Sequence, residues 1–111
     1  MKENTMVHCR LIMLNAQALR EEAKRYTEPE AKAIHDRLNL WADRLEDDVN
    51  SVKALISSIP DPIDRELFRM RYIKGDTWAK IECTLPYCRA QLYKRHRKQL
   101  DCWRDAGLLT K

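Results

Sequence analysis

Apolar residues recur at intervals of three and four along nearly the whole chain, the spacing that places side chains on one face of an α-helix. Alternating runs of β-branched residues, which would predict strands, do not occur, and the 111 residues include only two glycines. The pattern therefore predicts an all-α fold. Its interruptions divide the chain into an N-terminal helical segment, residues 1–59, and a C-terminal segment, residues 60–111.

The N-terminal segment is expected to contain two helices. The first covers residues 5–25, and its apolar stripe consists of Val7, Leu11, Leu14 and Ala18. The second is predicted to start at a capping box, in which Thr27 and Glu30 satisfy free backbone groups and Pro29 lies in the first turn. It should run from about Glu28 to Ser58. Its apolar positions are Ile34, Leu38, Trp41, Leu45, Val49, Val52, Leu55, Ile56 and Ile59.

The length of this second helix has a consequence for packing. A helix of about 30 residues is roughly 45 Å long, which is more than a domain of this size covers with its own side chains. The first helix can fold back along it as a hairpin, or two chains can pair as in a coiled coil. The two arrangements are compatible with each other. Asp47 and Asp48 interrupt the apolar seam. We expect a hairpin with coiled-coil character and favour a homodimer, with burial inside one chain as the alternative.

The C-terminal segment begins with a clear helix boundary. Pro60 cannot continue a helix, Asp61 is a good N-cap, and Pro62 fits the first helical position. The helix from Pro62 to about Lys74 should bury Ile63, Leu67 and Met70. Gly75 then supplies a left-handed stop, and Asp76 or Thr77 caps the next helix.

Residues 77–103 have the pattern of a short helix, a turn at Leu85-Pro86 and a longer helix. The short helix offers Trp78 and Ile81 to a core, and the longer one carries an inward stripe of Leu92, His96, Leu100 and Trp103. Polar residues occupy its other sides: Arg89, Gln91, Lys94, Arg95, Arg97, Lys98 and Arg104. A second helix that is apolar inside and rich in Arg, Lys and Gln outside is typical of a helix-turn-helix, in which it enters the major groove of DNA.

The distribution of charge supports a polyanionic partner. The formal net charge of the chain is +4, but residues 65–104 alone hold eleven Lys/Arg against four Asp/Glu, a net charge of +7. The basic residues are thus concentrated in the same region as the helix-turn-helix pattern, which favours nucleic acid as the partner. A solvated basic face without a partner is the plainer interpretation.

Other classes of protein receive little support. No window approaches the roughly 18 consecutive apolar residues of a membrane span, and the N-terminus lacks the features of a secretory signal, so we expect a cytoplasmic protein with reduced thiols. Cys88 and His96 would lie about 12 Å apart on one helix, too far to share a metal ion. We expect no metal, no cofactor and no enzyme activity. His96 is interpreted as a packed histidine.

Residues 59–103 also resemble a known group of proteins. They are similar to the fourth-region helix-turn-helix of bacterial sigma factors, and more closely to small phage and prophage transcriptional regulators of the ArpU/RinA type. The resemblance rests on Ile59, Pro60, Asp61, Arg65, Leu67, Arg71, Tyr72, Ile73, Gly75, Trp78, Ile81, Leu85, Tyr87, Leu92, Tyr93, Lys94, His96 and Leu100. The chain departs from the group's pattern at Glu82, Pro86, Cys88 and Ala90.

The resemblance implies roles for individual residues. Arg89, Gln91 and Lys94 would face base edges, because Arg and Lys suit guanine and Gln suits adenine. A second set would lie nearer the phosphates: Thr77, Lys80 and Lys98. Two further positions are candidates, Arg95 as a DNA-contacting cation and Tyr93 as a phosphate or base contact.

The resulting hypothesis is a phage or prophage transcriptional regulator that binds duplex DNA at promoters alongside host RNA polymerase. The N-terminal helices would serve for dimerisation or for a contact with the polymerase. A DNA-packaging subunit similar to a small terminase, and a polymerase- or sigma-binding protein without DNA affinity, are the two alternatives.

Overall fold

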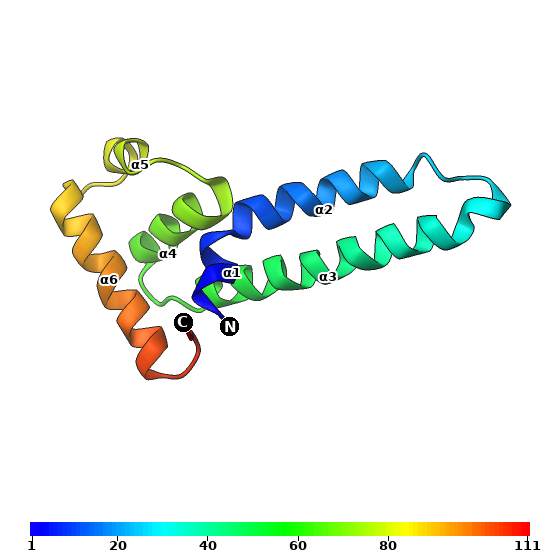
Figure 1. Cartoon of the computed structure of the whole chain (residues 1–111). Helices are drawn as coiled ribbons and strands as arrows, with labels where there is room; N and C mark the ends of the chain where they lie inside the picture. The colour runs from blue at the N-terminus through cyan, green and yellow to red at the C-terminus, as the bar shows by residue number, and fades with distance from the viewer.

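The computed structural model describes residues 1–111 and contains helices but no strands (Figure 1). In order they are α1 (Glu3–Val7), α2 (Cys9–Ala23), a 3₁₀ turn η1 (Pro29–Ala31), α3 (Lys32–Ser57), α4 (Pro62–Phe68), a π-helical turn η2 (Arg69–Lys74), α5 (Trp78–Thr84) and α6 (Arg89–Asp105). The expectation of an all-α fold is confirmed. The molecule measures 56 × 31 × 20 Å. Helices α2 and α3 lie side by side and project away from α4, η2, α5 and α6, which we call the C-terminal body.

The boundaries of the C-terminal helices follow from local chemistry, as expected. The Asp61 carboxylate accepts from the N–H groups of Ile63 (2.8 Å) and Asp64 (3.2 Å) at the start of α4. The Thr77 hydroxyl accepts from the Lys80 N–H (3.2 Å) at the start of α5. Gly75 has φ of 73°, a left-handed conformation that side chains disfavour and that ends η2.

Three predictions for the N-terminal helices are wrong. The expected apolar stripe of the first helix is exposed at Val7, Leu11, Leu14 and Ala18, because α2 turns its buried Cys9, Ala16 and Ala23 toward the rest of the chain.

The other two wrong predictions concern the ends of these helices. The capping box does not form, and α3 begins at Lys32 after the 3₁₀ turn, with Ala31 as a cap that has no side-chain bond. The residue before a proline is disfavoured in helical conformation, and Glu28 before Pro29 is extended (φ −72°, ψ 147°). The first expected helix is also divided into α1 and α2, because His8 departs from helical geometry (φ −96°, ψ 10°).

A continuous core lies where the base of the hairpin meets the C-terminal body. The largest side chains that it buries completely are Phe68, Met6, Leu67, Met70, Ile81, Leu92, Val52 and Cys9. Phe68 packs at 5.0 Å between ring centroids against both His96 and Trp103 of α6. Residues from both sides of the turn at 59–60 therefore share one core.

The hairpin expected from the sequence is present, and polar groups fix the register of its two helices. Arg20 of α2 donates to Asn39 (3.0 Å), Asp43 (2.5 Å) and Glu46 (2.8 and 3.0 Å) of α3. Such a cluster holds the helices at one relative height, because any shift breaks several charge-assisted bonds together.

Candidate nucleic-acid interface

The longest helix of the C-terminal body, α6, packs as its sequence stripe predicts. Leu92 is fully buried, Trp103 is 3% exposed, and His96 and Leu100 are half-buried. Thr77 and the short helix α5 bring Trp78 and Ile81 against the same side. The inward side of α6 is thus defined by its apolar residues, and its opposite side faces solvent.

An aromatic cluster fixes the rotation of α6. The His96 ring stacks on Phe68 (5.0 Å) and Tyr72 (5.8 Å) and meets the edge of Trp78 (5.2 Å). The Tyr72 hydroxyl and Nε2 of His96 are hydrogen-bonded at 2.5 Å. Burial lowers the pKa of His96 to about 4, with Arg71 and Arg104 adding to the effect. Burial likewise raises the pKa of Tyr72 to about 12. Both rings are therefore neutral at pH 7 and act as packing groups, as expected for His96.

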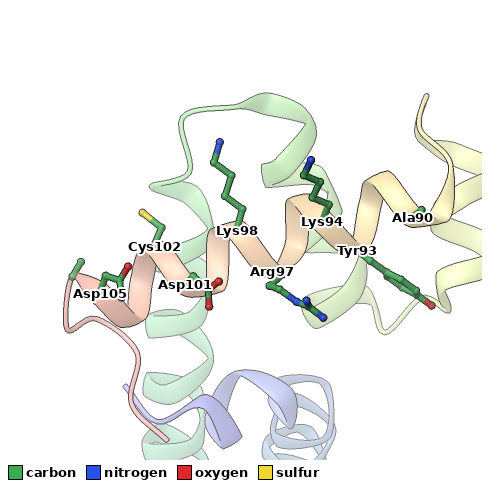
Figure 2. A pocket seen from close by; sticks show the side chains of 9 residues that line it. Ala90, Tyr93, Lys94, Arg97, Lys98, Asp101, Cys102 and Asp105 are labelled. Carbon is green, nitrogen blue, oxygen red and sulfur yellow. The ribbon is translucent and has the colours of Figure 1, made fainter.

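The solvent side of α6 carries three cations that make no ion pair within the chain. Lys94, Arg97 and Lys98 are all exposed, and we call these three residues the basic face. Within this solvent side, Lys94 and Lys98 point toward one edge of the helix and Arg97 points toward the opposite edge (Figure 2). Ala90, one turn before Lys94, keeps the surface open at the start of the helix. The arrangement suits a polyanion, because long cationic side chains reach outward on either side of a small residue.

The charge of this side changes sign along the helix. Asp101 and Asp105 follow the basic face on the same side of α6 (Figure 2). Asp101 also pairs with Arg104 (3.0 Å). Carboxylates repel phosphates, so a duplex would contact the N-terminal half of α6 and not its end.

The expectation that Arg95 projects outward is wrong. Its guanidinium donates to Asp64 (2.9 Å) and to the Tyr87 hydroxyl (2.8 Å), lies 3.7 Å from Asp61, and covers the Tyr87 ring at 4.2 Å from its centroid. Arg95 is three residues after Leu92 and therefore leans toward the buried side, where the acidic start of α4 receives it. The carboxylates raise the pKa of Arg95, so it stays charged as a bridge between α4 and α6.

The first turn of α6 also has internal partners. Arg89 donates to Glu82 of α5 (2.9 Å), although both side chains remain more than a third exposed. The Gln91 side-chain oxygen accepts from the Cys88 N–H (3.2 Å) and so caps the helix. Both residues lie at the surface beside the basic face, and both keep N–H donors that make no bond within the chain.

The three remaining candidates lie on or beside α5. The Thr77 hydroxyl is occupied as its cap, and Lys80 lies 3.4 Å from the buried carboxylate of Asp76 while its own side chain stays exposed. Tyr93 is 46% exposed and packs edge-on against Trp78 at 4.7 Å. These three residues lie at the border of the candidate interface, and the basic face lies at its centre.

One residue of the basic face was absent from the expected contact set. Arg97 lies on the flank of α6 that Tyr93 also occupies, three residues after Lys94 and seven after Ala90. Its angle from the inward stripe is similar to that of Arg95 on the other flank, so the stripe alone does not identify it. Arg104, by contrast, is half-buried and pairs with Glu3 of α1.

Neither a metal site nor a membrane span is found. No group of three or more His, Cys, Asp or Glu side chains could hold a metal ion. None of the helices combines the length and the apolar character that crossing a bilayer requires. Comparison of the chain with protein-family models, with curated proteins and with solved structures gives no match.

Proposed function

We propose that this protein binds duplex DNA, with α6 as the helix that enters the major groove. The observation that carries the proposal is the basic face: three exposed cations without internal partners, on a helix whose opposite side is held by Leu92, Trp103 and the aromatic cluster. A rigid helix with free cations on one side is what groove recognition requires. The concentration of positive charge in residues 65–104 supports the same partner.

The geometry divides the candidate residues into roles. Lys94 and Arg97 are the proposed base contacts, since Arg and Lys recognise guanine O6 and N7 in the major groove. Lys98 and Lys80 are the proposed phosphate contacts. Arg89 and Gln91 border this set, and each makes one internal bond, Arg89 to Glu82 and Gln91 at the helix cap. Arg95 is a positioning residue, because its partners lie on α4 and the turn before α6.

We further propose that the protein acts as a cytoplasmic transcriptional regulator of phage or prophage promoters, alongside host RNA polymerase. The support is the resemblance in sequence of residues 59–103 to such regulators. The structural features that agree with it are the short α5, the turn at 85–88 and the longer α6.

Fluorescence anisotropy with labelled duplex DNA across a salt series tests the proposal. Each phosphate contact contributes about −0.9 to the slope of log affinity against log salt. Lys98→Gln should therefore make the slope shallower by about 1, whereas Lys32→Gln, an exposed lysine at the start of α3, should leave it unchanged. A chain that binds no duplex in low salt contradicts the proposal.

Genomic fragments selected by the protein from its parent genome would then test the regulatory role. Enrichment of promoter fragments supports it. A ring of eight or more subunits would favour the packaging alternative, and tight capture of polymerase without DNA affinity would favour the interaction protein.

A further inference from the structure

The hairpin packs small residues inside and leaves large ones outside. Between residues 16 and 42 its buried positions are Ala16, Ala23 and Ala42. Ile34, Leu40 and Trp41 of α3, in contrast, are 47–50% exposed, and Leu11 and Leu14 of α2 are 54% and 45% exposed. Leu19 and Leu38 are half-buried. The part of the hairpin between residues 16 and 42 therefore holds its two helices together without a large apolar side chain that is fully buried.

Exposed apolar residues are concentrated on this part of the molecule. Of the eight large hydrophobic residues with the greatest exposure, six lie between residues 7 and 41, and the other two are Tyr93 and Leu108. The hairpin projects away from α6 in Figure 1, so a partner on it would leave the basic face free. Among the exposed apolar residues, Ile34 and Trp41 share one side of α3 because they are seven residues apart, and contiguous apolar exposure marks a site of association.

The charges on α3 specify which partner fits. Arg37, Trp41 and Asp48 lie on one stripe of α3, because spacings of four and seven return to the same side of a helix. Arg37 and Asp48 are both exposed, and neither makes an ion pair within the chain. The stripe thus has a cation, Arg37, at one end and an anion, Asp48, at the other, with Trp41 and the exposed Arg44 between them. Its two ends are complementary to each other when two copies run antiparallel.

We infer that a second copy of this chain packs antiparallel on α3, through a two-fold axis between Trp41 and Arg44. Arg37 of each chain then meets Asp48 of the other, as an isologous interface requires. A parallel arrangement would instead place like charges together. Two antiparallel hairpins form a four-helix bundle, which buries Trp41 of each copy.

The surface of α3 has a hollow where this packing needs one. A concavity of about 750 Å³ lies at the base of the hairpin, and its lining includes Asp48, Ser51 and Leu55 of α3. In the antiparallel register that pairs residue 37 with residue 48, residue 34 of the partner is opposite residue 51. The exposed Ile34 side chain of one copy therefore enters the hollow of the other.

The area of contact is sufficient for a specific dimer. Residues 34–51 of α3 span about 27 Å, and two adjacent helices are about 20 Å wide, which gives about 540 Å² from each copy. The total of about 1,100 Å² exceeds the roughly 1,000 Å² expected of a specific interface. The pairing of the two chains does not require nucleic acid. A negative result for dimer formation is therefore distinguishable from a negative result for DNA binding.

Sedimentation equilibrium of the full chain over a concentration series tests the inference. We expect twice the 13.2 kDa mass of one chain. Trp41→Ala should raise the dimer dissociation constant at least tenfold, whereas Tyr93→Ala, at an aromatic residue of equal exposure on α6, should leave it unchanged. Helical circular dichroism verifies that each variant is folded. A wild-type chain that remains a monomer, or Trp41→Ala without effect, overturns the inference.

A charge exchange tests the direction of the pairing. Arg37→Asp alone and Asp48→Arg alone should each weaken the dimer, and the double variant should restore it. The two positions are eleven residues apart on one helix and cannot restore each other within a chain. A double variant that is no tighter than the single ones excludes the antiparallel arrangement.

Discussion

In the C-terminal body, large aromatic and aliphatic side chains lie inside and cations lie outside, whereas in the part of the α2–α3 hairpin between residues 16 and 42 the fully buried positions are alanines and several large apolar side chains are exposed. The body is complete: Phe68, His96 and Trp103 form a dense cluster that holds α6 in one orientation. Between the two helices of the hairpin, Arg20 of α2 bonds to Asn39, Asp43 and Glu46 of α3. The two regions therefore differ in the surface that they expose: the C-terminal body exposes cations on a well-packed helix, and the hairpin exposes apolar side chains.

The largest effect is expected at the centre of the body. Phe68→Ala removes a fully buried ring that touches Tyr72, His96 and Trp103, and should cost about 3–5 kcal/mol of unfolding free energy. Urea denaturation measures it. In dilute solution, Trp41→Ala on the hairpin should cost less than about 1 kcal/mol, because that ring is half exposed. Equal losses for the two variants would remove the contrast between the regions.

The seam of the hairpin should reject a larger side chain. Ala42 is fully buried between α2 and α3, so Ala42→Leu should destabilise the protein by about 1–3 kcal/mol through overpacking. Ala18→Leu, on the exposed side of α2, is the matched control and should be nearly neutral. Thermal or urea denaturation compares them. A stabilising Ala42→Leu would show that the seam contains unfilled space.

The half-buried His96 should make the free energy of unfolding depend on pH. Its pKa of about 4 in the folded chain is below the unfolded value, so the unfolded state binds more protons as the pH falls. The contribution of His96 to the free energy of unfolding is therefore fully present above about pH 6.5 and is lost as the pH falls toward 4. Between pH 7.5 and 5 the loss should be about 2 kcal/mol. His96→Phe should abolish this component in urea denaturation, and an unchanged pH profile in that variant would contradict it.

A smaller difference in stability is expected between substitutions of two arginines of α6, Arg95 and Arg97. Arg95→Ala breaks the bridge to Asp64 and Tyr87 and should cost about 1 kcal/mol of unfolding free energy. Arg97→Ala removes an exposed side chain without an internal partner and should change stability by less than about 0.5 kcal/mol. Urea denaturation of the two variants side by side compares their unfolding free energies. Equal losses would mean that Arg97 also has a structural partner.

These two arginines also show where sequence reasoning stops. The stripe of Leu92, His96, Leu100 and Trp103 is a local pattern, and it gave the inward side of α6 correctly. The role of Arg95 depends on Asp64, which is 31 residues away in the chain and is brought close only by the packing of α4 on α6. No pattern within one helix distinguishes it from Arg97, because both are cations beside an apolar stripe.

Helix ends show the same limit at short range. Asp61, Gly75 and Thr77 were predicted correctly, since each acts on backbone groups within a few residues. Thr27 was not, because the extended backbone before Pro29 moved the start of α3 beyond its reach. The π-helical turn at Arg69–Lys74 had no sequence signal that we recognised. The outer faces of the hairpin and the hollow at its base likewise depend on tertiary packing.

The most direct test of the proposed DNA interface compares Arg97→Ala with Arg95→Ala in duplex-binding titrations across a salt series. The wild-type protein should bind duplex DNA with an affinity that falls steeply with salt. Arg97→Ala should weaken binding by about 1–3 kcal/mol at a selected site, with the chain still folded. Arg95→Ala should retain the wild-type salt slope wherever the variant is folded. Loss of binding on removal of Arg95 with none on removal of Arg97, or no duplex binding by the wild-type chain, would contradict the account.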